Sequence, residues 1–289
     1  MTNGILNINK PKGMTSHDVV NRVRRITSIR RIGHAGTLDP MATGVLVLCV
    51  GRATRLSEYL SKADKNYCAV VKLGVETDTY DAEGEVISSS STVIQREQVE
   101  TALDRFRGTI AQVPPMYSAV KHKGQPLYRL ARRGVTIKRK PRSTVVHHLE
   151  ITSWDPPFFG LEVTCSSGTY VRSLAHDLGQ QLQVGAHLTE LVRVSSGQLS
   201  LEKAVTLEEL VSGDWTRHLL PMEIAVAHLP CVKVDDIGAK RIRCGQRIER
   251  VRAHPKVDLV RACLEDGTFI GLLKPSEDRE EWLPHKVLA

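Results

Sequence analysis

The N-terminal part of the chain alternates short apolar runs with turn residues. Gly4–Asn9 alternates apolar and polar side chains and is followed by a Lys-Pro-Lys-Gly turn, a pattern that predicts a strand. Ser16 stands where a helix N-cap is expected, and valines recur behind it at helical spacing up to Ile26. We expect this helix to bury its valines and to point its arginines outward. The β-branched run Val45–Val50 is typical of a strand that is buried on both faces of a sheet.

Strands and helices continue to interleave further along the chain. The pattern predicts strands at Tyr67–Leu73, Thr144–Thr152 and Phe159–Cys165, the last two paired through a proline-containing turn. Helical spacing predicts helices at Gln95–Phe106 and Thr169–Leu182. These elements do not follow strict βαβ alternation, so the sequence predicts an α+β fold with a mixed or antiparallel central sheet.

The pattern changes near residue 230. Leu207–Val226 predicts a short helical linker, and the residues after it form short apolar strands separated by turns. Glu265–Thr268 lies between two such strands and is typical of a hairpin turn. We therefore expect a large domain over residues 1–229 and a small β-rich domain over residues 230–289.

Positive charge is concentrated in two segments of the chain. The formal net charge is +8 and the pI is about 9.2. Residues 121–142 contain only basic and uncharged side chains, and Arg22–Arg31 contains further arginines without an acid. Clustered basic groups favour phosphate binding, because each neutralised phosphate releases a condensed counterion. Net charge alone would also suit a basic enzyme with no polyanionic partner.

The cysteines and the apolar runs indicate the class of protein. The chain has 6 cysteines, all far apart, and no CxxC pair, which argues against a zinc ribbon or a thioredoxin-type redox site. No stretch is long and apolar enough for a membrane span, and the N-terminus has no apolar signal core. We expect a reduced, cytoplasmic protein that does not associate with membranes.

Several common catalytic motifs are missing from the sequence. There is no GxxxxGKS/T phosphate loop, no HExxH, no GxSxG and no GxGxxG after a strand. The one close histidine pair is His147 and His148, and neighbouring strand positions point to opposite faces. We therefore expect no cofactor and no metal site.

Asp39 lies in a loop shaped by glycine and proline. It precedes Pro40, which biases Asp39 toward an extended conformation, and Gly36 and Gly44 flank it. A carboxylate held by such a loop beside the buried strand at Val45–Val50 is well placed for catalysis. From these residues alone, a turn-capping role for Asp39 is equally acceptable.

Long motifs over essentially the whole chain resemble the TruB family of tRNA pseudouridine synthases. Their number and order make the resemblance more specific than any short pattern. It implies a pseudouridine synthase domain with a mixed or antiparallel sheet, and isomerisation of uridine 55 in the TΨC loop of tRNA. The motifs are NKPKGMTSHDVV (Asn9–Val20), GHAGTLDPMATGVLVLCVGRATR (Gly33–Arg55), KNYCAVVKLG (Lys65–Gly74), VPPMYSAVKHKGQPLYRLARRG (Val113–Gly134), CSSGTYVRSLAHDLG (Cys165–Gly179) and GAHLTELVRVSSG (Gly185–Gly197).

The resemblance implies three catalytic residues. Asp39 matches the family's catalytic aspartate, and Arg172 matches the arginine that pairs with it, which we expect to hold the pKa of Asp39 low. Tyr67 matches the tyrosine that stacks on the target base and is suspected of helping proton transfer at C5. From this one sequence, Tyr67 would also fit a core position and Arg172 a solvated helix position.

The resemblance also implies substrate-binding residues. Tyr170 and Leu191 match residues that line the uracil pocket, and His34 matches a histidine that enters the T-loop. Lys10 lies in a motif that packs beside the active site, and we group it with the substrate-binding residues.

Two further parts of the chain are implied to bind RNA. Residues 121–142 correspond to an insertion that closes over tRNA, and we expect a mobile loop there that contacts the RNA backbone through Lys138, Arg139 and Lys140. Residues 230–289 resemble a PUA domain, an RNA-binding module.

The expected partner is the T-arm of tRNA, bound by a monomer without a guide RNA. Two alternatives remain open from the sequence. One is a non-catalytic protein on the same scaffold that binds or folds tRNA. The other is an RNA-guided pseudouridine synthase.

Overall fold

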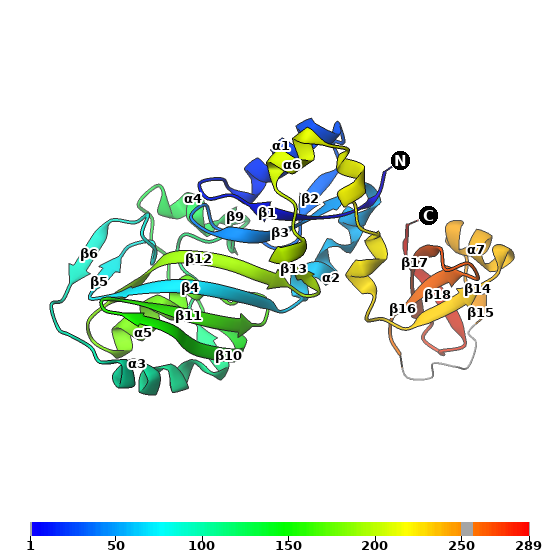
Figure 1. The fold of residues 1–289 in the computed structure, drawn as a ribbon. Helices are drawn as coiled ribbons and strands as arrows, with labels where there is room; N and C mark the ends of the chain where they lie inside the picture. The colour runs from blue at the N-terminus through cyan, green and yellow to red at the C-terminus, as the bar shows by residue number, and fades with distance from the viewer. Residues whose placement is uncertain (1, 250–256, 289) are drawn as a thin grey trace.

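A long mixed sheet forms the framework of the large N-terminal part (Figure 1). The computed structural model describes residues 2–249 and 257–288. The strands run in the order β1-β3-β12-β4-β11-β10-β7, with β2 paired to β3 and β13 paired to β12. The β3–β12 pair is parallel and the other pairs are antiparallel, so the predicted α+β fold with a mixed sheet is confirmed. The strands are β1 (Gly4–Lys10), β2 (Ile32–His34), β3 (Thr43–Val50), β4 (Lys65–Leu73), β7 (Gly108–Gln112), β10 (Arg142–Asp155), β11 (Phe158–Cys165), β12 (Ala186–Ser196) and β13 (Leu199–Ser200).

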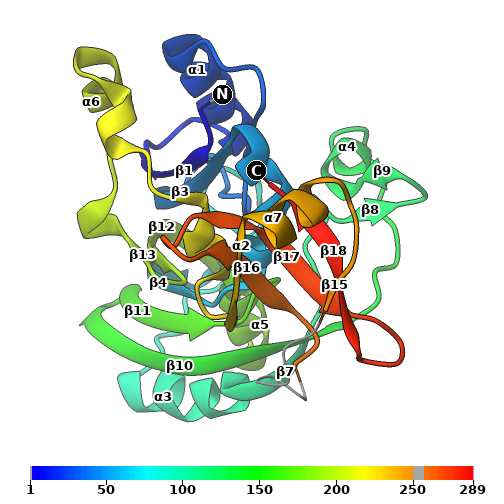
Figure 2. The same ribbon diagram turned by 90° about the vertical axis from the view of Figure 1, so that its right-hand side faces the viewer.

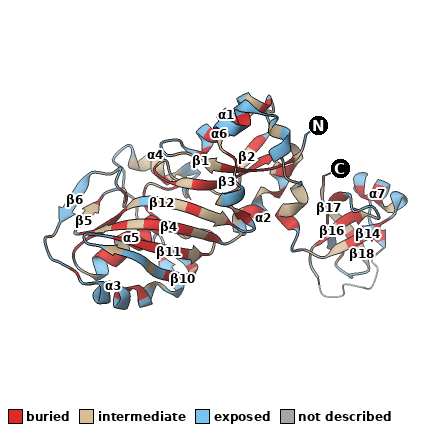
Figure 3. Cartoon of the chain, viewed as in Figure 1, coloured by how far each residue is buried: buried red, intermediate tan, exposed pale blue. Residues whose placement is uncertain are grey.

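The two faces of this sheet bury different apolar clusters. Leu46 and Leu48 of β3 join a cluster that also contains Val19 of α1. Val45 and Val47 face the opposite way, into a second cluster. The prediction that this strand is buried on both faces is therefore confirmed, and Figure 3 shows buried residues following the central strands. The helices of this part are α1 (Ser16–Thr27), α2 (Ser57–Lys62), α3 (Arg96–Leu103), α5 (Val171–Gln181) and α6 (Leu207–Ser212), with the 3-10 turns η1 (Gly51–Leu56), η2 (Asp104–Phe106), η3 (Leu201–Lys203), η4 (Trp215–His218) and η5 (Met222–Val226).

The first helix begins differently from the prediction. Thr15 caps α1, and its hydroxyl and the Asp18 side chain form a reciprocal capping box. The Ser16 hydroxyl instead bonds both the backbone N–H and the carbonyl of Leu38. Arg22 and Arg25 are exposed as predicted, but Arg24 turns back and donates to the Ile32 carbonyl at 2.8 Å. The helix is thereby fastened to the loop that contains Asp39.

A second sheet follows the helical linker. Its order is β14-β16-β17-β18-β15, and β16 and β17 form the predicted hairpin. Helix α7 (Asp236–Arg243) and the bounds of the last strand were not predicted from the sequence. One face of this sheet packs around the fully buried Trp282, and the other joins the second cluster of the large sheet. The strands are β14 (Cys231–Val234), β15 (Ile248–Glu249), β16 (Val260–Leu264), β17 (Phe269–Pro275) and β18 (Glu281–Val287).

Two small hairpins project from the large sheet. One pairs β5 (Val75–Thr77) with β6 (Val86–Ser89). The other lies in the basic segment, which we predicted to be a loop. There β8 (Lys121–His122) and β9 (Gln125–Pro126) pair and lead into the short helix α4 (Leu127–Ala131). Figure 2 shows this hairpin and α4 set off from the sheets. Among the described residues, no helix combines the length and apolarity that a bilayer crossing requires.

Candidate active site

The loop between β2 and β3 carries Asp39 and leads into the part of β3 that pairs with β12. Its backbone needs glycine at Gly36 and Gly44, where φ is +111° and +97°. A Cβ at Gly44 would lie 2.3 Å from the Arg193 carbonyl oxygen, because β3 and β12 approach closely there. The loop is thus held by the parallel strand pair as well as by Ser16.

Arg172 forms a two-point ion pair with Asp39. Its Nη2 lies 2.9 Å from Asp39 Oδ1, and its Nε lies 2.9 Å from Oδ2. Asp81, a residue that the sequence analysis did not single out, occupies the other side of the guanidinium at 3.2 Å from Nη1. Backbone carbonyls of Thr79 and Tyr117 accept further hydrogen bonds at 3.0 and 2.8 Å. The guanidinium is only 4% exposed, so these contacts fix its orientation.

The electrostatics of Asp39 differ from the expectation. Burial raises the pKa of its carboxyl, the Arg172 charge opposes this, and the Asp81 charge raises the pKa further. Arg172 lowers the pKa of Asp39 as predicted, but the expectation of a low pKa is wrong. The main physical reason is burial of the carboxyl, to which the Asp81 charge adds because the two carboxylates share one cation. The Asp39 side chain nevertheless remains 31% exposed toward the cavities.

A cavity of about 230 Å³ begins at Asp39 and is lined by the residues predicted for the uracil pocket. Tyr67 of β4 and Leu191 of β12 form part of its lining and are 8% and 6% exposed. Tyr170, directly before α5, lines the same cavity. Burial raises the pKa of the Tyr67 phenol, so this hydroxyl is neutral at physiological pH. The structure thus brings Asp39, Tyr67, Arg172, Tyr170 and Leu191 to one cavity.

A second cavity of about 460 Å³ opens on the other side of the ion pair. His34, Tyr128 of α4 and Arg132 line it together with Asp81 and Glu83. His34 is half-buried, and burial lowers the pKa of its imidazole. The carboxylates sit beside the ion pair, whereas Arg132 comes from the basic segment.

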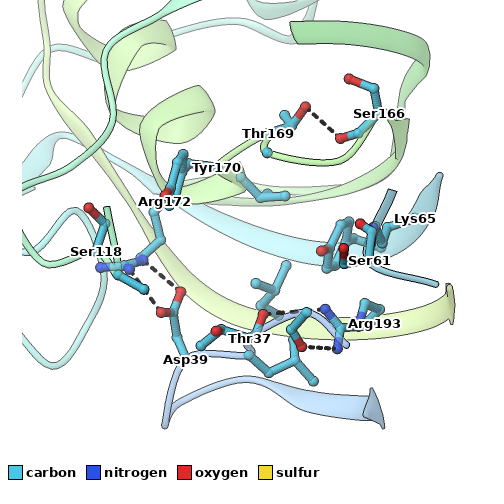
Figure 4. Close-up of a pocket in the computed structure, with 17 residues that line it drawn as sticks. Thr37, Asp39, Ser61, Lys65, Ser118, Ser166, Thr169, Tyr170, Arg172 and Arg193 are labelled. Carbon is cyan, nitrogen blue, oxygen red and sulfur yellow. Dashed lines mark hydrogen bonds and ion pairs between the residues drawn. The ribbon is translucent and has the colours of Figure 1, made fainter. Parts of the chain in front are cut away.

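Arg193 is a further buried residue that the sequence analysis missed. It is 1% exposed and lies opposite Tyr67 in the β4–β12 pair. Its guanidinium donates to the carbonyls of Val45, Thr37 and Gly36 at 2.6, 3.3 and 3.1 Å. Figure 4 shows the bonds to Thr37 and Gly36 running from Arg193 to the loop that carries Asp39. Arg193 therefore ties the strand beside Tyr67 to the Asp39 loop.

Lys10, which we grouped with the substrate-binding residues, lines neither cavity. Its side chain is fully buried, and its ammonium donates to the carbonyls of Pro11, Met14 and Pro40. Burial lowers the pKa of this ammonium to about 8. Lys10 holds the turn before α1 against the residue that follows Asp39.

The three basic residues predicted to contact the RNA backbone lie outside both cavities and differ in exposure. Lys138 and Lys140 are exposed. Arg139 is half-buried, and its guanidinium donates to the Pro114 carbonyl at 3.1 Å. Arg139 thus anchors the basic segment, whereas Lys138 and Lys140 present their charges to solvent.

One group of side chains has the composition of a metal site. His148, Glu150 and Glu162 place ligand atoms within 4.8 Å of one another on β10 and β11. Asn66 donates to Glu162 at 2.9 Å. Within the described residues this group lies outside both cavities, so it has no geometric link to Asp39.

Three family models match consecutive parts of the chain, from residue 24 to residue 278. Residues 24–171 match the family described as "TruB family pseudouridylate synthase (N terminal domain)". The chain belongs to the TruB family. Residues 172–227 and 230–278 match two further TruB families, "tRNA pseudouridylate synthase B C-terminal domain" and "Pseudouridine synthase II TruB, C-terminal".

Several TruB relatives are similar over most of their length. The chain is 44% identical to a tRNA pseudouridine synthase B of Dehalococcoides mccartyi (strain CBDB1), covering 98% of this chain and 96% of the relative. It is 51% identical to the tRNA pseudouridine synthase B of Symbiobacterium thermophilum, covering 84% and 82%. Among solved structures, a Cbf5-Nop10-Gar1 complex contains a chain with 28% identity and a TM-score of 0.77, covering 99% of this chain and 85% of that one.

Proposed function

We propose that this chain isomerises uridine 55 in the TΨC loop of tRNA to pseudouridine. The observation that carries the proposal is the Asp39–Arg172 ion pair, which lies where two cavities meet, with Tyr67 lining the smaller one. The similarity to relatives named tRNA pseudouridine synthase B supports tRNA as the substrate.

The reaction needs a carboxylate and a closed pocket rather than a carrier of electrons or groups. The N1–C1′ bond of uridine breaks, the uracil turns, and a C5–C1′ bond forms while C5 loses a proton and N1 gains one. The base must first leave its stack, at a cost of a few kcal/mol. Stacking on Tyr67 recovers about 1–3 kcal/mol, and Leu191 helps keep water away from the broken glycosidic bond.

In this proposal Asp39 acts on the ribose in its ionised form. Arg172 orients the carboxylate through two contacts, and Asp81 holds Arg172 from the other side. Tyr67 helps proton transfer at C5, and Tyr170 completes the wall of the base pocket. His34, in the larger cavity, contacts the neighbouring part of the T-loop.

The remaining parts of the chain bind the rest of the T-arm. Lys138 and Lys140 contact the RNA backbone. Residues 1–229 form the catalytic domain, and residues 230–289 form a PUA-like RNA-binding domain, of which residues 250–256 and 289 lie outside the described part. The chain acts as a monomer.

The test is turnover of unmodified tRNA by the purified protein, without guide RNA or partner proteins. We expect the wild type to form pseudouridine at position 55, detected by carbodiimide mapping. Asp39→Asn should bind tRNA but form no product. Normal turnover by this variant would remove Asp39 from the mechanism, and tRNA binding without product by the wild type would favour the non-catalytic tRNA-binding protein.

The same assay distinguishes an RNA-guided synthase. Such an enzyme would leave unmodified tRNA unchanged until a guide RNA is added. The chain is 44–51% identical to the relatives named tRNA pseudouridine synthase B, but 28% identical to the Cbf5 complex. We therefore expect turnover without a guide.

A further inference from the structure

Ser118 lies at the junction of the two cavities, beside the ion pair. Its segment is part of the connection from β7 to the basic hairpin. Figure 4 places Ser118 next to the guanidinium of Arg172. The junction consists of the residues that line both cavities: Thr37, Leu38, Asp39, Ser118, Ala119 and Arg172.

The backbone around Ser118 is fixed, but its hydroxyl is not satisfied. The Ser118 N–H donates to the Met116 carbonyl at 2.9 Å, and its carbonyl accepts from the Tyr128 N–H at 3.1 Å. The residue is 5% exposed, and its Oγ has no hydrogen-bond partner. Burying a hydroxyl without a partner costs free energy, so such a group in a cavity points to a ligand that completes it.

The other residues of the junction offer no buried hydroxyl that lacks a partner. Asp39 and Arg172 pair with each other, and Leu38 and Ala119 have apolar side chains. Thr37 is exposed to solvent. Ser118 therefore supplies a buried hydroxyl at the junction that has no partner within the protein.

The charge at the junction indicates which part of a nucleotide passes through it. The larger cavity is lined by three carboxylates, Asp39, Asp81 and Glu83, and by two guanidiniums, Arg132 and Arg172, so a phosphate placed there would meet net negative charge. A ribose carries no charge and would not be repelled by these carboxylates. If the base occupies the smaller cavity and Asp39 acts on the sugar, the ribose itself crosses the junction, and this step rests on the function proposed above.

We propose that Ser118 Oγ forms a hydrogen bond with the 2′-hydroxyl of the target uridine. A hydroxyl can donate one hydrogen bond and accept two, so either hydroxyl can donate to the other and give Ser118 Oγ a partner. Deoxyuridine lacks this group, and binding it would leave Ser118 Oγ unsatisfied. Ser118 is then a specificity-determining residue by which the site distinguishes RNA from DNA.

Tyr170 is the rival partner of Ser118 within the protein. Burial raises the pKa of the Tyr170 phenol, and the nearby Ser118 hydroxyl lowers it in part, although the two do not meet the geometry of a hydrogen bond. If Ser118 only supported Tyr170, its loss would weaken every RNA equally. A contact with the 2′-hydroxyl would instead weaken only RNAs that carry that group.

The experiment is a cycle of two proteins and two RNAs. Wild type and Ser118→Ala are each titrated with a T-arm RNA that has uridine or 2′-deoxyuridine at the target position, and Kd and single-turnover rates are measured. We expect the deoxy substitution to weaken wild-type binding by roughly five- to tenfold and to have little effect on Ser118→Ala. Equal losses in both proteins would overturn the proposal.

Two controls locate the contact. Ser61→Ala removes a hydroxyl that lines the smaller cavity but already donates to the Glu58 carbonyl, so its effect should be the same for both RNAs. A second RNA has 2′-deoxyribose at the next nucleotide instead of the target. This substitution should change Kd by the same factor for wild type and for Ser118→Ala. Coupling of Ser118 to that neighbouring sugar would overturn the assignment to the target nucleotide.

The design also separates this inference from the function on which it rests. Pseudouridine formation by the wild type in the all-ribose RNA tests the proposed reaction alone. The coupling between Ser118 and the 2′-hydroxyl is read from Kd, which does not require turnover. Product formation without coupling would thus reject the inference and leave the reaction in place.

Discussion

The Arg172 guanidinium pairs with two carboxylates, Asp39 and Asp81. Together with burial, this arrangement affects the pH below which Asp39 becomes protonated. Because burial and Asp81 raise the pKa of Asp39, its carboxyl takes up a proton at a higher pH than the ordinary value of 3.8. A reaction that needs ionised Asp39 therefore loses rate as the pH falls through this raised pKa. Removing the Asp81 charge should lower the pKa and move the loss of activity to lower pH.

Asp81→Asn tests this relation. We expect kcat to fall about 10- to 100-fold, because Arg172 loses one of the contacts that position it, and the acid limb of the pH–rate profile to move to lower pH. Glu162→Gln, the same change of charge outside both cavities, should leave the limb in place. A limb that stays unchanged in Asp81→Asn would show that Asp81 does not influence the ionisation of Asp39.

Arg172→Lys tests the two-point contact at the same scale. A lysine keeps the positive charge but offers no planar fork, so it cannot reach Asp39, Asp81 and the two carbonyls together. We expect kcat to fall roughly 100-fold or more, with tRNA affinity little changed. Single-turnover assays measure the rate, and a wild-type rate would mean that charge alone is sufficient.

At the scale of elements, the parallel contact between β3 and β12 positions the Asp39 loop. Arg193 bonds three carbonyls on or beside that loop, while its own backbone leaves no room for a side chain at Gly44. The loop geometry therefore depends on strand packing as well as on its own residues.

Gly44→Ala should disrupt this contact. The combination of a positive φ and a Cβ 2.3 Å from a carbonyl oxygen should lower the free energy of unfolding by roughly 2 kcal/mol or more. Gly33→Ala is the matched control, since the nearest heavy atom to its added Cβ is 4.0 Å away. Urea unfolding measures both, and equal stability of the two variants would contradict the argument.

At the scale of the whole molecule, the exposed lysines of the basic segment lie outside the cavity that holds the buried Asp81. Lys138 and Lys140 follow α4 and line neither cavity, whereas Asp81 is 3% exposed in the larger one. This separation suits an RNA whose backbone stays outside while one nucleotide enters.

Lys138→Gln with Lys140→Gln tests the basic segment. Losing two phosphate contacts should reduce the slope of log K against log salt concentration by about 1–2. Arg96→Gln with Arg105→Gln removes the same charge near α3, which Figures 1 and 2 both place away from α4, and should leave the slope unchanged. An unchanged slope in the first variant would place the phosphate contacts elsewhere.

The local pattern of the sequence was sufficient for some of these features but not for others. Valine spacing predicted α1, and the motif match placed Asp39, Tyr67 and Arg172, which the fold brings to one cavity. Asp81 and Arg193 were missed because their partners come from distant segments, which a local pattern does not reveal.

The burial of individual basic side chains could not be predicted from the sequence either. Lys10 and Arg139 have the side chains of surface residues, yet both donate to backbone carbonyls. The α7 helix was missed because it is short and leaves Ile237 73% exposed, which obscures its periodicity.

Arg52 lies where the two ends of the described chain meet. Its backbone N–H donates to the Asn3 side chain at 2.7 Å, and its guanidinium donates to the Leu288 carbonyl at 3.0 Å. Figure 1 shows the two ends close together at the side of the molecule that faces the second sheet. Residues 3 and 288 are therefore close enough to be joined by a short linker. A circularly permuted chain with this linker and with new ends at another surface turn should keep the fold.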